Sequence, residues 1–336
     1  MHAVLCRRSP GATVAGFEDV RIALPNDLRD RDLLVRVQAA SLNPLDARRA
    51  AARPDPDPNG TVLGWSAIGV VEAVGACVRG FSPGELVWYA GAPDRPGCFA
   101  ELQLVDERLA GRAPLGLSPD EAAALPLAAL TAAEALFDHL RIGERAAPHV
   151  LFINGGGGAV ASMAVQLARL KPSVEVIATA GSERSRQWLM QIGAHHIVDH
   201  RRCLWRQVRQ LPCPAPASVF SMFTNETSWQ SYITMLEPFG HICVADHPDR
   251  LDFAAARDKS IALHWQAMFT RARHMSAASG HQGRHLTRIA QLFDSGALTP
   301  LPVQPSAAMR ADSIAAALAR PGGARPVFLV NKRIDK

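Results

Sequence analysis

The chain has 336 residues, 48% of them apolar and 20% charged, which suits about two globular domains and is too hydrophobic for a disordered protein. The net charge of +5 is small, the basic residues are scattered and aromatic residues make up only 6%, so we expect no nucleic-acid partner. The six cysteines form no CxxC pair, which is typical of free thiols in a reducing compartment. Arg7 and Arg8 interrupt the start of the chain, unlike in a signal peptide. We therefore expect a cytoplasmic protein with no membrane-spanning segment.

Short strands broken by glycine and proline are predicted over the first 120 residues. Apolar alternation at 33–37 and strands at 69–75 and 85–89 stand among closely spaced glycines, as in a tightly turned β-barrel. At Ser118 a capped, acidic helix start changes the pattern and introduces an Ala- and Leu-rich run.

Strands and helices alternate from His149 onward, which favours a parallel, doubly wound sheet. The alternation is lost after about Leu263. The predicted elements of this half are strands at 149–153, 174–178, 196–199, 218–221 and 241–245, helices at 161–170, 183–192, 285–294 and 312–319, and a final strand at 326–330.

A glycine turn joins the first of these strands to the first helix. The spacing Gly156-x-Gly158-x-x-Ala161 is a dinucleotide fingerprint, and it occurs between a strand and a helix as that fingerprint requires. Glycine lets a pyrophosphate approach the backbone, and the helix N-terminus attracts its charge. The turn therefore predicts a cofactor site formed by Gly156, Gly157, Gly158, Ala159 and Val160, the alternative being a glycine-rich turn without a ligand.

The tip of the second strand favours NADPH over NADH. An NAD site places Asp or Glu there for the ribose 2′-OH, whereas this chain has no acid at the tip, and Glu183 starts the next helix. Ser182 with Arg184 or Arg186 could hold a 2′-phosphate through charge-assisted hydrogen bonds. The alternative is that these arginines form only a solvated helix face.

Metal and hydrolase motifs are missing from the sequence. His195 and His196 would point to opposite faces of a strand, and His281 and His285 lack the glutamate of an HExxH motif. There is no GxSxG elbow and no Tyr-x-x-x-Lys pair, which excludes a serine hydrolase of that kind and a short-chain reductase.

Several segments together resemble one protein family along essentially the whole chain. They are Ser41–Asp46 (SLNPLD), Leu63–Val71 (LGWSAIGVV), Val87–Gly91 (VWYAG), Ala122–Leu127 (AAALPL), the glycine turn, Ile192–His196 (IGAHH) and Leu263–Arg271 (LHWQAMFTR). On these the chain resembles the zinc-free, quinone-oxidoreductase-like branch of the medium-chain dehydrogenase/reductase superfamily, a subgroup often labelled as zinc-binding alcohol dehydrogenases.

The resemblance implies that no metal is bound. Asn43 and Trp65 stand where zinc-dependent relatives have a Cys and a His ligand, and neither residue binds zinc. Only Cys98 remains where those relatives have a four-cysteine lobe. A quinone or a conjugated C=C spreads the charge of an incoming hydride over its own π system and needs positioning rather than a Lewis acid.

The resemblance also assigns roles to residues. It implies catalytic positions at Asn43, Asp46 and Tyr89, with Trp65 and Phe269 as substrate wall. Further cofactor contacts follow at Thr131, Ser182, Arg184, His200, Phe269 and Arg271.

The fold implied is α/β: a GroES-like β-barrel domain, residues 1–123 and 263–336, and a Rossmann doubly wound parallel-sheet domain, residues 124–262. We expect NADPH in the cleft between them, a small-molecule quinone or enone as substrate, and a homodimer. The predicted function is NADPH-dependent transfer of hydride to a quinone or an activated C=C bond. The alternative, motivated by Ala159, Ala161 and Val327, is a catalytically weak or inactive fold that binds a ligand or partner.

Overall fold

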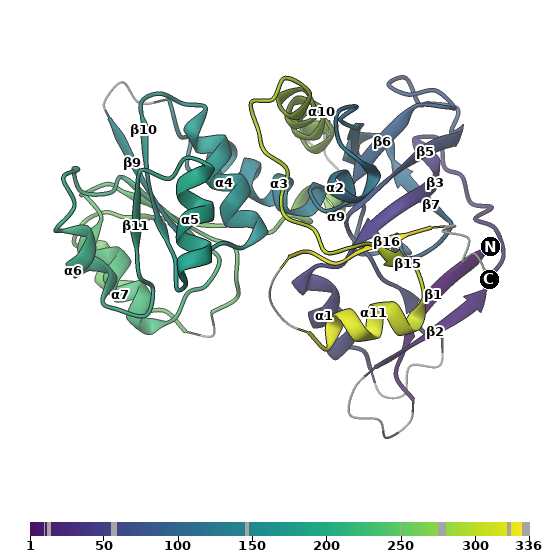
Figure 1. Ribbon diagram of the computed structural model, residues 1–336, viewed down its shortest axis with the longest axis horizontal. Helices are drawn as coiled ribbons and strands as arrows, with labels where there is room; N and C mark the ends of the chain where they lie inside the picture. Colours follow the sequence, from purple (N-terminus) through teal and green to yellow (C-terminus); the bar gives the residue numbers. More distant parts are fainter. Residues whose placement is uncertain are drawn as a thin grey trace. The chain divides into compact units, whose positions relative to one another are not determined.

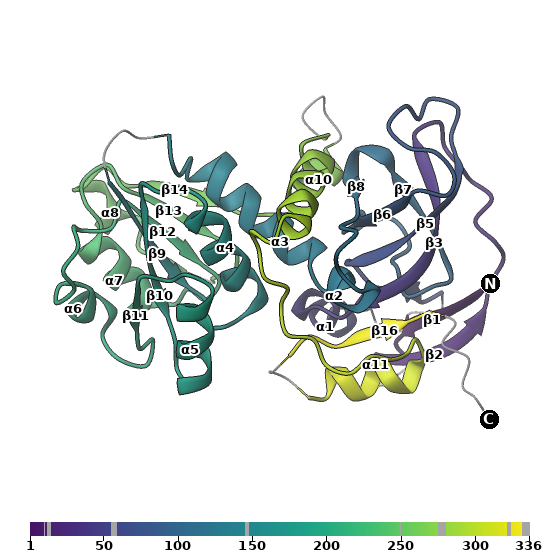
Figure 2. The ribbon, with the colours of Figure 1, turned by 45° about the horizontal axis from the view of Figure 1, so that its top comes forward.

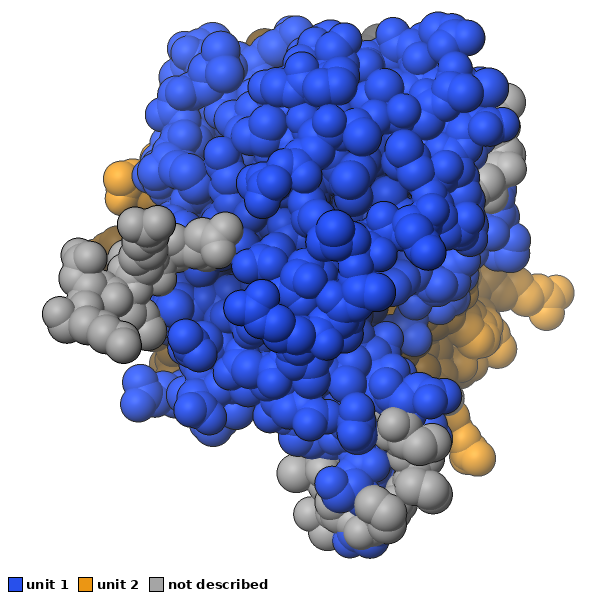
Figure 3. Space-filling model, turned by 90° about the vertical axis from the view of Figure 1, so that its right-hand side faces the viewer, with its two compact units in different colours: residues 1–127, 269–336 blue, residues 128–268 orange. Residues whose placement is uncertain are grey.

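The computed structural model describes residues 1–9, 11, 15–54, 59–144, 148–248, 250–274, 280–320 and 324–330. It forms two compact units, which Figure 3 colours separately. Unit 1 comprises Met1–Leu127 and Phe269–Lys336, and unit 2 comprises Ala128–Met268.

Unit 1 is built on two sheets. In the smaller one β1 pairs antiparallel with both β2 and β4, and in the larger one the strands lie in the order β15-β16-β3-β5-β6-β8, with β7 also pairing with β3. The strands are β1 (His2–Arg7), β2 (Gly16–Arg21), β3 (Asp32–Ser41), β4 (Thr61–Val62), β5 (Ala67–Val74), β6 (Leu86–Tyr89), β7 (Leu102–Asp106), β8 (Ala110–Arg112), β15 (Ala307–Ala308) and β16 (Val327–Leu329).

The C-terminal segment completes unit 1, because β16 adds antiparallel to β3 and pairs Val327 with Ser41. At Ser118 the predicted helix start is confirmed: its side chain and that of Glu121 form a capping box. The helices are α1 (Pro44–Ala51), η1 (Glu107–Leu109), α2 (Pro119–Ala123), α9 (Thr270–Arg273), α10 (His281–Asp294) and α11 (Ala311–Leu318). Helix α3 (Pro126–Ala133) runs across the boundary into unit 2.

Unit 2 is a parallel six-stranded sheet in the order β11-β10-β9-β12-β13-β14. This is the doubly wound order in which the chain starts at the centre, builds one half outward and then returns to build the other. The strands are β9 (His149–Asn154), β10 (Val174–Thr179), β11 (His196–Val198), β12 (Ser218–Ser221), β13 (His241–Val244) and β14 (Ala262–Trp265).

Helices cover both faces of this sheet, with α4 and α5 on one side and α6, α7 and α8 on the other (Figures 1 and 2). Burial on both faces explains why the strands are almost continuously apolar. The helices are α4 (Ala159–Arg169), α5 (Glu183–Gln191), α6 (Leu204–Val208), α7 (Glu226–Met235) and α8 (Ala254–Arg257), and a π-helical turn, η2 (Glu134–His139), precedes the sheet.

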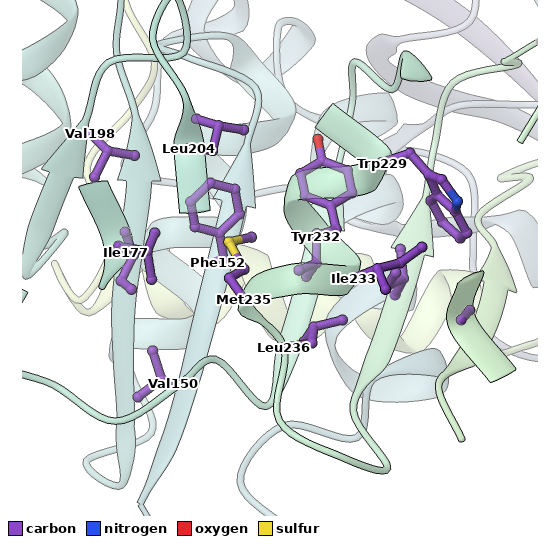
Figure 4. Close-up of a cluster of buried hydrophobic side chains, with 14 of the residues drawn as sticks. Val150, Phe152, Ile177, Val198, Leu204, Trp229, Tyr232, Ile233, Met235 and Leu236 are labelled. Carbon is purple, nitrogen blue, oxygen red and sulfur yellow. The ribbon is translucent and has the colours of Figure 1, made fainter. Parts of the chain in front are cut away.

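The core under α6 and α7 is a single apolar cluster, shown in Figure 4. Phe152 from the central strand is fully buried there, and its ring lies 6.1 Å from that of Tyr232 on α7. Because Phe152 is two residues before the end of β9, this packing anchors the strand close to the point at which the chain leaves the sheet.

The structure confirms the predicted α/β fold, with the following differences in bounds. The compact units meet four and six residues beyond the predicted boundaries at 123 and 262. The second difference has a physical cause: residues 262–265 form β14, which pairs with β13 and so belongs to the parallel sheet. Helix α10 begins four residues before the predicted start at 285.

All six cysteines are free, as the sequence predicted. Among the residues that the structure describes, no helix combines the length and the apolar character needed to cross a bilayer.

Replacing Phe152 with Ala should lower the free energy of unfolding by about 3–5 kcal/mol, because it removes a fully buried ring and leaves a cavity. Phe239→Ala is the matched control: that side chain is 69% exposed, and its loss should change stability by less than about 0.5 kcal/mol. Denaturant unfolding followed by circular dichroism measures both, and equal effects of the two variants would contradict the assigned core.

Candidate active site

A cavity of about 530 Å³ opens in unit 2 at the carboxyl end of the central strand. This is the end at which doubly wound sheets bind their ligands. The lining residues come from the glycine turn and from the segments that follow β11 and β12: Asn154, Gly155, Gly156, His200, Arg202, Leu204, Met222, Phe223, Asn225, Thr227, Ser228 and Ser231.

The glycine turn is shaped by two separate constraints. A Cβ on Gly155 would lie 2.1 Å from Met222 Cε and 3.0 Å from the Ala161 Cβ, so a larger residue would require the Met222 side chain to move. Gly156 has a φ of +57°, in the left-handed region that favours glycine. Gly158 then begins α4 without any side-chain cap, so the first N–H groups of α4 are left for solvent or an anion.

A buried polar network at the ends of β9 and β10 supports the glycine turn. The Thr179 hydroxyl donates to Asn154 Oδ1 at 3.0 Å and accepts the backbone N–H groups of Gly155 and Gly156, each at 3.3 Å. The Asn154 amide in turn donates to the Phe223 carbonyl at 2.8 Å. The network ties the ends of β9 and β10 together, so the backbone of the turn is set before any ligand arrives.

The residues predicted for the 2′-phosphate lie close together at the strand tips. A Cβ on Gly181 would lie 2.6 Å from the His200 ring, so this imidazole covers the residue directly before Ser182. Ser182 caps α5 by accepting the Ser185 N–H at 3.2 Å, and Arg184 follows in the exposed first turn.

Of that group only His200 lines the cavity, where it is joined by the exposed Arg202. Sequence reasoning missed Arg202, although it stands only two residues after His200. Arg201 between them is held by Asp199, with a guanidinium-to-carboxylate distance of 2.8 Å. Arg202 Nε lies farther from the same carboxylate, at 4.0 Å, and its side chain reaches the cavity wall.

In unit 1, Asn43 and Asp46 lie together at the start of α1. The Asn43 backbone N–H donates to Asp46 Oδ2 at 2.7 Å, and the Asn43 side-chain amide donates to the Ser41 carbonyl at 3.1 Å. The Arg325 guanidinium donates to Asn43 Oδ1. Arg325 is a half-buried residue next to β16, and sequence reasoning missed it because it lies 282 positions from its partner.

Burial raises the pKa of the Asp46 carboxyl to about 7. Hydrogen bonds from the Asn43 and Gly64 backbone and the positive charge of Arg325 lower this pKa, but burial outweighs them. Burial likewise lowers the pKa of Arg325 to about 10, so this guanidinium stays charged near neutrality. Asp46 can therefore gain or lose a proton near pH 7.

The two predicted wall residues contact each other within unit 1. The rings of Trp65 and Phe269 are 6.0 Å apart in an edge-to-face arrangement, and the Arg49 guanidinium lies 5.9 Å from the Trp65 ring. The Trp65 indole N–H donates to the Ala92 carbonyl at 3.3 Å. These contacts fix the Trp65 ring as a rigid surface.

Tyr89 lies inside unit 1, where its side chain is almost fully buried. Its hydroxyl oxygen has no hydrogen-bond partner among the described residues. Burial and the neighbouring Cys98 raise the pKa of Tyr89, so the hydroxyl keeps its proton at neutral pH. Thr131 is buried on α3, and Arg271 is half-buried on α9.

Two protein families match the two halves of the chain. An alcohol dehydrogenase GroES-like domain matches residues 29–114, and a zinc-binding dehydrogenase domain matches residues 159–261. A zinc-type alcohol dehydrogenase-like protein of Staphylococcus aureus (strain MSSA476) is 36% identical over 279 residues, which is 81% of this chain and 82% of that protein. A chloroplastic quinone-oxidoreductase homologue of Spinacia oleracea is 32% identical over 60% of this chain and 61% of its own length.

Solved structures agree on the fold. A protein of Rhizobium etli CFN 42, provisionally called a zinc-dependent alcohol dehydrogenase, superimposes with a TM-score of 0.91, at 35% identity and over 98% of both chains. The Escherichia coli quinone oxidoreductase complexed with NADPH superimposes with a TM-score of 0.78, over 98% of this chain and 100% of that one. At 17% identity the latter shows the fold alone.

The buried Asp46 carboxyl should make stability fall as pH rises. Its pKa is raised in the folded protein, so the folded state holds the proton more tightly than the unfolded chain does. Between about pH 4 and pH 7 the free energy of unfolding of the wild type should therefore fall by roughly 2–4 kcal/mol relative to that of Asp46→Asn. Urea unfolding of both proteins across this range tests the assignment, and a difference that does not change with pH would refute it.

Proposed function

Since the chain belongs to the medium-chain dehydrogenase/reductase superfamily, as a quinone-oxidoreductase-like oxidoreductase, we propose that it uses NADPH to reduce a quinone or a conjugated C=C bond. The observation that carries the proposal is the cavity of unit 2, whose lining brings Gly155 and Gly156 of the glycine turn together with His200 and Arg202. Such a site suits a dinucleotide with an additional phosphate.

The residues present fit this cofactor. The glycine turn with Ala159 and Val160 would hold the pyrophosphate, and Ser182, Arg184, His200 and Arg202 would hold the 2′-phosphate. Glu183, the acid nearest the strand tip, accepts instead from Gln187 on its own helix, at 3.1 Å. We assign Thr131, Phe269 and Arg271 to the nicotinamide end, as the family resemblance implies. A bound NADPH supplies a hydride.

The residues of unit 1 do not fit a catalytic zinc ion. Both polar groups of the Asn43 side chain are engaged, by Arg325 and by the Ser41 carbonyl, and the Trp65 indole offers no lone pair to a metal. Cys98 is buried, and its thiol faces the Ser66 carbonyl, with a sulfur-to-oxygen distance of 3.7 Å. We therefore propose an acceptor that needs no Lewis acid.

Unit 1 would then supply orientation and a proton. Trp65 and Phe269 are both largely buried and pack edge to face, and we assign this aromatic pair to the binding of a flat, conjugated acceptor. Burial raises the pKa of Asp46 to about 7, so this carboxyl can hold a proton near neutral pH. The pKa of Tyr89 is raised as well, so its hydroxyl stays protonated at neutral pH. Arg325 keeps Asn43 and Asp46 in place, so a positive charge remains beside the group that releases its proton.

Arg202→Gln should raise the Kd for NADPH about 10- to 100-fold and leave the Kd for NADH unchanged, because only NADPH carries the 2′-phosphate. Arg184→Gln should act in the same direction. Arg186→Gln, on the same helix as Arg184, decides between the two arginines that the sequence offered and should leave both Kd values unchanged if Arg184 holds the phosphate. Cofactor fluorescence titrations measure each Kd, and an equal loss for both nucleotides would contradict the assignment.

The wild-type protein should oxidise NADPH with benzoquinone or an α,β-unsaturated ketone but not with a saturated ketone, since only conjugated acceptors delocalise the developing charge. With NADPH deuterated at the nicotinamide C4, the label should appear on the β-carbon of the enone. Tight NADPH binding without turnover of any such acceptor would instead support a ligand-binding role for the fold.

A further inference from the structure

Glu175, His196 and Cys213 converge in unit 2 at the end of the sheet opposite the glycine turn. Glu175 is the second residue of β10, His196 is the first of β11, and Cys213 lies in the segment before β12. These positions belong to none of the residues assigned above to cofactor, substrate or catalysis.

The geometry of the three side chains suits one metal ion. His196 Nε2 and Glu175 Oε1 are 2.6 Å apart, and one ligand atom of each of the three side chains lies within 4.8 Å of the others. All three side chains are half-buried, so partial shielding from water would strengthen their hold on a cation.

The backbone holds these side chains on one face of the sheet. His196 pairs directly with Ile177 in the parallel ladder, and Glu175 precedes Ile177 by two residues. The side chains of Glu175, Ile177 and His196 therefore lie on the same face of the sheet. Cys213 packs against the apolar cluster that contains Ile177. The strands therefore place Glu175 and His196, and packing against the core places Cys213 in the segment before β12.

His195 shows by contrast what a structural histidine does here. Its Nδ1 accepts the Val176 backbone N–H at 2.9 Å, so this ring provides a hydrogen-bond acceptor for a backbone donor of β10. In His196 the nitrogen that could bind a metal already faces a carboxylate, and a thiol stands beside both.

We propose that Glu175, His196 and Cys213 form a zinc site, with water as the fourth ligand. Imidazole, thiolate and carboxylate are the ligands that Zn²⁺ takes in tetrahedral sites. On binding, the Cys213 S–H bond breaks, its proton passes to solvent and a Zn–S bond forms with no change of oxidation state. The hydrogen bond between His196 and Glu175 is replaced by their two bonds to the metal.

This site is separate from the proposed cofactor site. Glu175 lies four positions before Thr179, the β10 residue under the glycine turn, which is a span of about 13 Å along the strand. The zinc would join β10, β11 and the segment before β12, so its expected effect is on the stability of unit 2.

Titration with Co²⁺, a spectroscopic substitute for Zn²⁺, tests the proposal. One equivalent should produce a thiolate-to-cobalt charge-transfer band, and Zn²⁺ should displace it. Cys213→Ser should abolish the band, and His196→Gln should weaken metal binding at least about tenfold. Cys203→Ser, an exposed cysteine of the same unit, and His195→Gln are the matched controls and should bind as the wild type does.

A second measurement covers variants that fold poorly. Zn²⁺ should raise the Tm of the wild type and of both controls by a few degrees and leave that of Cys213→Ser unchanged. Absence of the band in the wild type, its persistence in Cys213→Ser or its loss in Cys203→Ser would each overturn the proposal.

Discussion

The hydrogen bonds between Thr179, Asn154 and the glycine turn are the constraint on which the cofactor half of this protein depends. Thr179 ends β10 and Asn154 ends β9, so one hydroxyl joins two neighbouring strands and also receives the N–H groups of Gly155 and Gly156. Because these donors and acceptors are satisfied inside the protein, the turn needs no ligand to hold its shape. The helix that follows the turn has no side-chain cap, so its first N–H groups are left for solvent or an anion.

Local patterning was enough to predict the elements that surround this turn. Runs such as His149–Asn154 are apolar because both faces of the sheet are covered, and the glycine spacing marks where the strand ends. Local patterning did not predict β14. Its residues are half-buried or exposed at the edge of the sheet and so lack the apolar signal of the inner strands. The difference in the second domain boundary follows directly from that weak edge.

The site in unit 1 was predictable by position but not by chemistry. The resemblance assigned Asn43 and Asp46 to one site, and the structure joins them by a hydrogen bond, but the pKa of Asp46 depends on how deeply the folded chain buries it. Nor could the sequence reveal that Arg325, from the far end of the chain, contacts Asn43. Val327, which motivated the alternative of a weak or inactive fold, is a buried residue of β16 that pairs with Ser41.

The structure also distinguishes two cysteines that the sequence could not tell apart as metal ligands, Cys98 in unit 1 and Cys213 in unit 2. In unit 1, Cys98 is buried with its thiol facing the Ser66 carbonyl, and among the described residues it belongs to no group of three His, Cys, Asp or Glu side chains that could hold a metal. In unit 2, Cys213 has both an imidazole and a carboxylate beside it. A metal site needs several donors to meet at one point, and here that meeting depends on the register of β10 against β11. Register is set by which residues the sheet buries, so the folded core decides which cysteine can bind a metal.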